Sequence, residues 1–259
     1  KENNLIDTHS HIYGEQFDED IKDVMQRVKD NGVSKVFLPN IDVASIPRLK
    51  QLTADYPDVC LPMMGLHPCS VGADSKDQLA IIKKELESCD DYVAVGEIGI
   101  DLYWDKSFLA QQQDAFRIQI QWAKDKGLPI IIHCRDSFDE IFEILKEEND
   151  DKLFGILHCF SGTLEEGLKI IALGDFYLGI GGVVTFKKVG LDQIVKALPL
   201  DKLVIETDAP YLTPTPFRGK RNESSYVKYI AEKIATVKEI SLEEVAEITS
   251  SNALKVFKQ

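Results

Sequence analysis

The segment LIDTHSHI (5–12) joins a short apolar run to two histidines, and it indicates how the whole chain is built. An apolar run of this length is typical of a strand that is buried on both faces of a parallel sheet. Because alternate residues of a strand share a face, His9 and His11 are expected to point the same way. Thr8 and Ser10 are expected to point the opposite way. The segment therefore predicts a buried strand that ends in two neighbouring imidazoles.

Seven further apolar runs follow at intervals of roughly 30 residues, the size of a strand–helix unit. Amphipathic segments lie between them, such as 18–32, 109–127 and 137–148, the last opening with a Ser137 cap. Eight such units in one chain predict a single α/β domain over 1–259, a (β/α)8 TIM barrel. An open doubly wound sheet is the alternative, and it more often has fewer strands. The expected strands are 4–9, 35–39, 59–65, 92–97, 129–133, 153–158, 175–180 and 203–207.

The composition limits the classes of function. Hydrophobic residues make up 44% of the chain, enough for a large core, and the formal net charge is −13. A chain this acidic has no general basic surface for a polyanion. A phosphate or nucleic-acid substrate would therefore need metal ions or a few Arg and Lys side chains to meet its charge.

The cysteines and the hydropathy pattern bear on location. The five cysteines are scattered and odd in number, which is typical of reduced thiols rather than of a disulfide framework. No apolar run reaches the roughly 18 residues of a membrane span. The first strand is expected to begin at Leu5, which leaves no room for a signal peptide. We therefore expect a cytoplasmic protein with no membrane partner.

All five histidines fall at or just beyond the expected carboxyl ends of strands. Two acidic residues, Glu97 in VAVGEIGID and Asp208 in VIETDAP, do the same. In a barrel these strand ends meet on one face, where active sites are built. The histidines are His9, His11, His67, His133 and His158.

This set has the chemistry of a metal centre. An HxH pair at a strand end is a natural chelate, and Glu97, His133, His158 and Asp208 add two nitrogens and two carboxylates. That exceeds what one tetrahedral ion needs and suits two bridged ions. Taken singly, a strand histidine is more often a core residue, and Asp208 is a candidate N-cap.

Three residues next to this set are assigned differently. His67 lies on a loop, in HPCS, and is expected to contact substrate rather than metal. Cys134 and Cys159 directly follow two of the histidines and should therefore face the other way. We expect these two cysteines to be small core residues.

Six motifs in this order resemble the TatD family of metal-dependent hydrolases and deoxyribonucleases, within the amidohydrolase superfamily of barrels. The resemblance runs from Ile6 to about Val227. The motifs are IDTHSHI, GLHP, VGEIGIDLYW, PIIIHCRDS, LHCFSG and ETDAPYLTPTPFRGKRNE. Two positions depart from the family pattern: Ser10 stands where cysteine is frequent, and Ser224 stands where proline is usual.

The resemblance implies a divalent-metal hydrolase of phosphodiesters, often a 3′–5′ exonuclease on DNA. It implies two ions, with Glu97 as the bridge between them. Donors of this type admit Zn, Mn, Mg, Co or Ni. The implied ligands are His9, His11, Glu97 and Asp208 for one ion, and Glu97, His133 and His158 for the other.

Roles for the neighbouring residues follow as hypotheses. Two ions would activate a water for attack on phosphorus, and Asp208 would take its proton. His67 would contact the scissile phosphate or the leaving oxygen. Glu206, which shares a face with Asp208, is expected to support a ligand from behind or to bind a further ion.

The substrate side rests on a few exposed residues. Arg135, and Arg218 with Lys220 and Arg221, are candidates to bind phosphate; a solvated loop is the alternative. Tyr103, with its neighbour Trp104, is a candidate to stack on a base, and covering the barrel mouth is the alternative. The expected partner is single-stranded DNA as substrate, with no obligate protein partner.

Two other functions stay open on the sequence alone. The same site would serve an amidohydrolase or esterase, including one that releases amino acids from tRNA. The third possibility is a metal-binding barrel without catalysis, which the complete ligand set disfavours.

Overall fold

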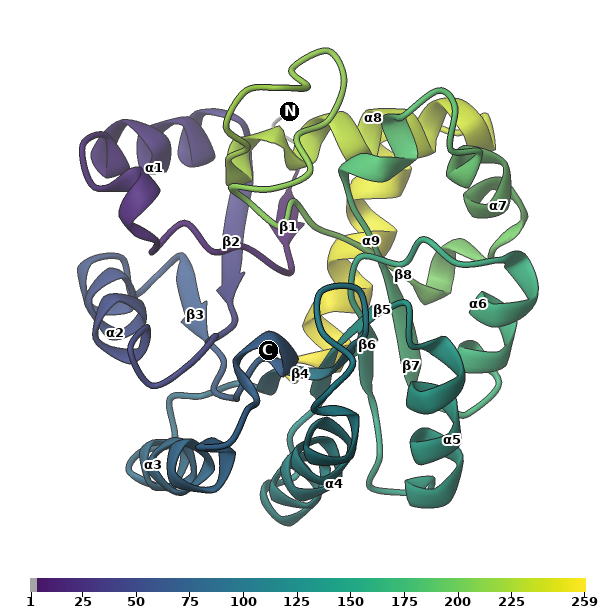
Figure 1. The fold of residues 1–259 in the computed structure, drawn as a ribbon. Coiled ribbons are helices and arrows are strands. Elements are labelled where there is room, and N and C mark those ends of the chain that lie inside the picture. Colours follow the sequence, from purple (N-terminus) through teal and green to yellow (C-terminus); the bar gives the residue numbers. More distant parts are fainter. Residues whose placement is uncertain (1–3) are drawn as a thin grey trace.

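The computed structural model describes residues 4–259, in which eight parallel strands alternate with helices around a common centre (Figure 1). The prediction of a (β/α)8 barrel is confirmed. The strands are β1 (Leu5–Asp7), β2 (Val33–Leu38), β3 (Cys60–Pro62), β4 (Val95–Asp101), β5 (Ile130–Arg135), β6 (Gly155–Leu157), β7 (Phe176–Ile180) and β8 (Leu203–Ile205). The helices are α1 (Ile21–Asp30), α2 (Ile46–Asp55), α3 (Ser75–Glu87), α4 (Leu109–Lys126), α5 (Phe138–Glu148), α6 (Leu164–Ile171), α7 (Leu191–Ala197), α8 (Val227–Lys238) and α9 (Leu242–Val256). The single domain predicted over 1–259 stays a prediction, and its residues 1–3 lie outside the described residues.

Regular strand pairing is interrupted at two seams. The ladders form a three-stranded sheet, β1-β2-β3, and a five-stranded sheet, β4-β5-β6-β7-β8. Scattered backbone hydrogen bonds still cross between the sheets. At one seam Gly96 N donates to Met64 O at 3.1 Å, and at the other Thr8 N donates to Ile205 O at 3.1 Å. Both seams lie beside chemically active residues, because Glu97 follows Gly96 and His9 follows Thr8. The irregular pairing leaves these two segments free to turn their side chains towards the barrel axis.

A separate apolar cluster fills the inside of the barrel. It draws only on the strands, their flanks and the end of the chain, and the ring of Phe257 stacks on that of Phe37 at 3.8 Å. Helix α9 passes behind the strands in Figure 1 and contacts both β1 and β8, so the chain end closes the floor of the barrel. The cluster comprises Ile6, Phe37, Met63, Ala94, Ile131, Ile156, Val204, Ala253, Val256 and Phe257.

The expected elements are all present, but one strand is displaced. The sequence predicts a strand over 92–97 that ends in Glu97, whereas β4 runs from Val95 to Asp101 and Glu97 is its third residue. All seven residues of β4 are buried. Strand pairing continues past the carboxylate because Gly99 has a φ of 146°, and a Cβ there would lie 2.0 Å from the carbonyl oxygen of His133. Only glycine permits this close approach between β4 and β5.

Tertiary hydrogen bonds change two local expectations. Ser137 precedes α5 but makes no side-chain cap, because its hydroxyl donates to the carbonyl of Ile100 at 2.6 Å. The polar segment 213–225 is expected to be an exposed loop. Its middle is largely exposed, but its end is not, because Asn222 is fully buried. Its side-chain amide donates to the carbonyls of Thr207 and Tyr211 at 2.8 and 2.7 Å. This folds the loop back over the end of β8.

Within residues 4–259 no helix has both the length and the apolarity that crossing a bilayer requires. The five cysteines all lie in this range, and all are free thiols.

Replacing Phe257 by alanine should lower the free energy of unfolding by about 3–5 kcal/mol, because it leaves a cavity under the barrel floor. Denaturant titration followed by circular dichroism measures this change. The control is Ile118→Ala on the outer face of α4, where the side chain is exposed and the change should stay within about 0.5 kcal/mol. Equal stability of the two variants would show that the chain end does not support the barrel.

Candidate metal centre

Glu97 lies at the centre of the site, and the residue is 1% exposed. Its Oε1 lies 3.1 Å from Nε2 of His9 and 3.3 Å from Nε2 of His11. Thr8 and Ser10 point away, as the alternation of the strand predicts, since their hydroxyls bond to Ile205 and Ser224 instead. One oxygen of Glu97 therefore faces the HxH pair.

The second oxygen of Glu97 faces the other three histidines. Its Oε2 lies 2.9 Å from Nδ1 of His133 and 3.1 Å from Nε2 of His158. Nε2 of His67 is 3.3 Å away. All five histidines, drawn from four different strand ends, thus converge on a single buried carboxylate.

Asp208 completes the group around the first oxygen. Its Oδ1 lies 3.5 Å from Nε2 of His9 and 3.4 Å from Nε2 of His11. The residue has a φ of 55°, in the left-handed region that aspartate tolerates better than most residues. Its N–H donates to the carbonyl of His9 at 2.9 Å, so the seam between β1 and β8 holds it in place.

Asp7 connects β1 to the segment after β8 at this seam. The sequence analysis did not identify it. One carboxylate oxygen accepts the N–H groups of Thr207 and His9, at 3.0 and 3.2 Å. The other accepts the Thr207 hydroxyl at 2.5 Å. Burial raises the pKa of Asp7 to about 7, against these hydrogen bonds. Asp7 thereby ties the segment that carries His9 to the one that carries Asp208.

The outer nitrogens of three histidines are occupied by acceptors. His133 Nε2 lies 2.7 Å from Oδ2 of Asp101, and His158 Nδ1 lies 2.9 Å from Oε1 of Glu206. His11 Nδ1 lies 3.1 Å from the hydroxyl of Tyr13. This hydroxyl donates its hydrogen to the carbonyl of Pro39, so it can only accept a hydrogen bond from His11. Each outer nitrogen must therefore carry a hydrogen and donate it.

This arrangement determines what the inner nitrogens can do. With the outer nitrogen as the donor, the neutral imidazole turns a lone pair towards Glu97 or Asp208. A lone pair that faces a carboxylate at about 3 Å needs a positive charge between them. In the protein alone a proton takes that place. Burial by itself would lower the pKa of His11, but hydrogen bonds to Asp208 and Glu97 raise it to about 10.

The carboxylates respond in the opposite direction. Burial by itself raises the pKa of Glu97, but the imidazoles that surround it, chiefly those of His67, His9 and His158, hold it well below the usual range. Burial also opposes ionisation of Asp208, where the hydrogen bond from His11 and the nearby imidazoles keep the pKa low. Both groups are therefore carboxylates, the form that binds a cation.

His67 differs from the other histidines. Its Nδ1 accepts the backbone N–H of Cys69 at 3.0 Å, so the hydrogen of the neutral ring is on Nε2 and points at Glu97. Burial lowers the pKa of His67, which favours this neutral ring. Distance alone would admit His67 as a metal ligand, together with Glu97 and His133. Its tautomer makes it a hydrogen-bond donor to the centre.

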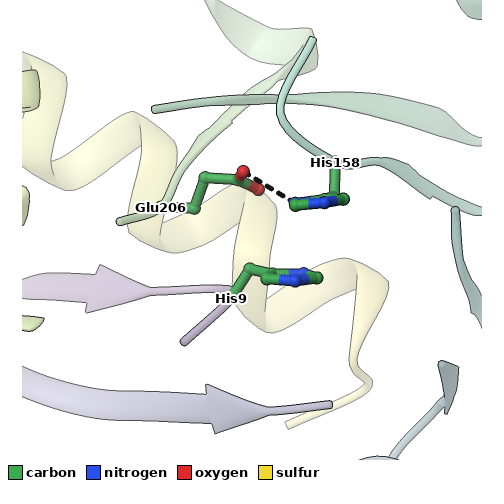
Figure 2. A group of neighbouring side chains, drawn as sticks. All are labelled: His9, His158 and Glu206. Carbon is green, nitrogen blue, oxygen red and sulfur yellow. Dashed lines mark hydrogen bonds and ion pairs between the residues drawn. The ribbon is translucent and has the colours of Figure 1, made fainter. Parts of the chain in front are cut away.

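His9, His158 and Glu206 form a further group that is able to bind an ion (Figure 2). The rings of His9 and His158 stack with their centroids 3.6 Å apart, and Glu206 lies beside the outer nitrogen of His158. His9 Nδ1 and Glu206 Oε2 are buried and have no hydrogen-bond partner among the described residues. Gly179 makes room for this carboxylate, because a Cβ there would lie 2.4 Å from Oε2. The set of donors fits a cation better than it fits an apolar core.

Asp101 is a residue of the site that the sequence analysis missed. It supports His133 with one oxygen, and the other accepts the N–H of Tyr103 at 2.9 Å. The signal was present in GEIGID, because Glu97, Gly99 and Asp101 alternate along one face of a strand. It was overlooked because the strand was expected to end at Glu97.

The six arginines divide into two groups. Four form ion pairs with carboxylates, and the other two, Arg135 and Arg218, have no carboxylate oxygen within 4.0 Å among residues 4–259. Each lies 3.8 Å from the centroid of an aromatic ring instead, Arg135 over Tyr103 and Arg218 over Phe186. Arg221 is less available than expected, because its guanidinium holds Asp20 in a bidentate pair at 2.9 and 2.6 Å.

Aromatic rings stand exposed beside Arg135. Tyr103 is 51% exposed and Trp104 is 72% exposed, with their rings edge to face at 4.7 Å. A tryptophan is rarely left so open to water. Asp101 hydrogen-bonds both to His133 and to the backbone of Tyr103. The aromatic pair is therefore connected to the centre through Asp101.

Cys134 and Cys159 are both half-buried, and Cys134 packs against the core as expected. Together with His158 they also line a hollow of about 430 Å³ between the loops after β5 and β6. Burial raises the pKa of Cys134 to about 11 and that of Cys159 further. They are therefore neutral thiols near neutral pH.

The two departures from the family pattern contact each other. The hydroxyl of Ser224 donates to that of Ser10 at 2.8 Å, and both side chains are buried. A buried hydroxyl needs a partner, and each serine supplies one for the other. Neither side chain lies against Glu97.

A (β/α)8 barrel that gathers imidazoles and carboxylates at the carboxyl ends of its strands defines a class, the metal-dependent hydrolases. Known proteins support this class and specify it. A family model described as TatD related DNase matches residues 6–258. The chain therefore belongs to the TatD family and is a metal-dependent hydrolase.

Individual relatives cover nearly the whole chain. The uncharacterized metal-dependent hydrolase YabD of Bacillus subtilis (strain 168) is 44% identical over 255 residues, 98% of this chain and 99% of that protein. The 3′-5′ ssDNA/RNA exonuclease TatD of Rahnella sp. (strain Y9602) is 32% identical, over 93% and 94% of the two chains. The crystal structure of YJJV, a TatD homologue from Escherichia coli K12, superposes with a TM-score of 0.93 at 29% identity over all of both chains.

Replacing Asp101 by asparagine should weaken metal binding about 10–100-fold, because the residue orients His133 from behind. Competition with a chromophoric chelator measures the affinity. Asp105→Asn is the matched control, since Asp105 is exposed in the loop after β4 and its carboxylate accepts hydrogen bonds from Ser107. An affinity equal to that of the control would remove Asp101 from the metal centre.

Proposed function

We propose that the protein is a 3′–5′ exodeoxyribonuclease that acts on single-stranded DNA with two divalent ions. The observation that carries the metal centre is the tautomer pattern: the outer nitrogens of His11, His133 and His158 meet acceptors, so their inner nitrogens are free to bind metal. His9, His11 and Asp208 would hold one ion, and His133 and His158 the other. Glu97 would bridge them, since each of its oxygens faces one group.

When bound, such ions supply positive charge that lowers the pKa of a water and neutralises phosphate oxygens. Imidazole and carboxylate donors suit Zn or Mn better than Mg alone; Co and Ni also fit. Glu206 would hold the ring of His158 from behind, and with His9 it offers a place for a further ion.

Asp208 is assigned the role of general base, which takes the proton from the attacking water. It is a carboxylate at the mouth side of the centre, and its Oδ1 already lies against both nitrogens of the HxH pair. A general base must reach the proton it removes, and this oxygen faces the space between the strand ends. His67 is assigned the opposite role, because its neutral ring can donate from Nε2 to a phosphate oxygen or to the leaving oxygen.

The proposal that the substrate is a nucleic acid is supported by residues in the loops around the barrel mouth. Arg135 and Arg218 have guanidinium groups that no carboxylate neutralises, so they are available to phosphate. Tyr103 and Trp104 present exposed rings on which an unpaired base can stack. The relative from Rahnella, named as an exonuclease on single-stranded DNA and RNA, supports the same choice. A cytoplasmic location and the absence of an obligate protein partner stay predictions.

Metal-free protein given Mg, Mn, Zn, Co or Ni should shorten a 5′-labelled single strand one nucleotide at a time from its 3′ end. Asp208→Asn should keep the fold by circular dichroism and lose about 10²–10⁴-fold in turnover. Asp201→Asn, an exposed change before β8, is the control. Turnover retained in Asp208→Asn would remove that residue from the base role. A filled metal site with no cleavage by any ion would move the function to ester or amide hydrolysis.

Two substitutions test whether His67 acts as a proton donor or as a metal ligand. His67→Ala should lower turnover of the same strand about 10²-fold or more, since a proton donor is lost. His67→Gln should recover part of it, because its amide also donates. Metal content by elemental analysis should match the unmodified protein in both variants. Loss of one ion per chain in His67→Ala would make His67 a ligand and contradict the tautomer argument.

A further inference from the structure

The loops after β7 and β8 differ in charge from the rest of the chain. Residues 181–190 and 209–221 contain five Lys or Arg and no Asp or Glu, in a chain that has 43 acidic residues among 259 and a net charge of −13. Such a stretch is unusual where about one residue in six is acidic. These two loops therefore form a local exception in an acidic protein.

Four of the five cations in these loops have no ionic partner. Arg221 is paired with Asp20, but the other four are exposed, and no carboxylate oxygen of residues 4–259 lies within 4.0 Å of them. Unpaired cations gathered in one place leave a positive field that a polyanion can use. We call these four the cationic surface: Lys187, Lys188, Arg218 and Lys220.

Direct contacts join the two loops into one surface. The N–H of Thr215 donates to the hydroxyl of Thr185 at 2.9 Å, and the guanidinium of Arg218 lies over the ring of Phe186. The backbones also touch, since a Cβ at Gly182 would lie 2.0 Å from the carbonyl oxygen of Leu212. The neighbour of Phe186 is Lys187. The lysines of one loop and the arginine of the other therefore belong to one continuous patch.

One loop carries residues of both the metal centre and the cationic surface. The loop after β8 contains Asp208, whose carboxylate contacts His9 and His11, and Arg218 follows ten residues further on. Tyr211 and Leu212, both exposed, lie on the same loop between these points. A strand that presents one phosphate to the centre thus has a path along which its other phosphates meet positive charge.

We propose that the cationic surface is a binding subsite for the phosphates of the strand beyond the scissile one. This rests on the proposed function, because the subsite serves the same substrate. Lysines act as point charges on phosphates and do not read bases. The contribution should therefore be independent of sequence and sensitive to salt. Each phosphate contact adds about 0.7 to the slope of log affinity against log salt for a single strand.

The test compares Lys187→Gln/Lys188→Gln with a matched control, Lys29→Gln/Lys152→Gln. The control removes the same charge from two exposed lysines that precede β2 and β6, at the opposite end of the barrel. Affinity of the metal-loaded protein for a fluorescent single strand of about 15 nucleotides is measured by anisotropy over 50–200 mM salt. Phosphorothioate linkages protect the strand from cleavage.

We expect the Lys187/Lys188 variant to bind the strand about tenfold more weakly than the control at low salt, with a salt slope smaller by about 1–2. Turnover of a nucleoside 5′-p-nitrophenyl phosphate, which has one phosphate, should be equal in both. Equal affinities and equal slopes for the long strand would overturn the proposal, as would a similar loss on the small substrate. If the protected strand binds as expected but an unmodified strand is left intact with every ion tested, the exonuclease proposal is contradicted and the cationic surface stands.

Discussion

One buried carboxylate organises this protein. Glu97 is almost fully enclosed, and an ionised carboxyl in such a place is costly unless positive charge or strong donors surround it. Five imidazoles from four strand ends supply that surrounding, with three of them turned by acceptors behind them. The arrangement keeps Glu97 ionised. It also leaves several nitrogen lone pairs and two carboxylates facing one small volume, which is the environment of bound cations.

The barrel is adapted to this carboxylate at its irregular points. Ladder pairing lapses between β3 and β4 and between β8 and β1, and the residues at these breaks include Glu97, His9 and Asp208. Between β8 and β1, Asp7 connects the two segments in place of the missing ladder, because it accepts three hydrogen bonds from His9 and Thr207. Apolar packing under the floor, where Phe257 meets Phe37, is continuous and separate from the polar centre. Stability and chemistry are thus placed at opposite ends of the barrel, as is usual in this fold.

Charge is also distributed unevenly over the molecule. The surface is acidic on the whole, which by itself would repel a nucleic acid. Two arginines after the strand ends are exceptions, because Arg135 and Arg218 lie on aromatic rings instead of on carboxylates. Stacking holds each guanidinium in place and leaves its hydrogen-bond donors free. In the function that we propose, these two guanidiniums would give a polyanion a restricted approach to the candidate metal centre.

The sequence by itself determined the barrel, the order of its strands and the residues that meet at its mouth. It did so because buried parallel strands are read from apolar runs, and the carboxyl ends of such strands must share one face. Only the tertiary structure decided the direction in which each imidazole presents its lone pair, since that depends on Tyr13, Asp101 and Glu206 behind the rings. It also placed Glu97 inside β4, because the cost of burying a carboxylate depends on partners that are distant in the chain. The pairing of Arg221 with Asp20, and the absence of such a pair at Arg218, were invisible for the same reason: side-chain partners are chosen across the fold.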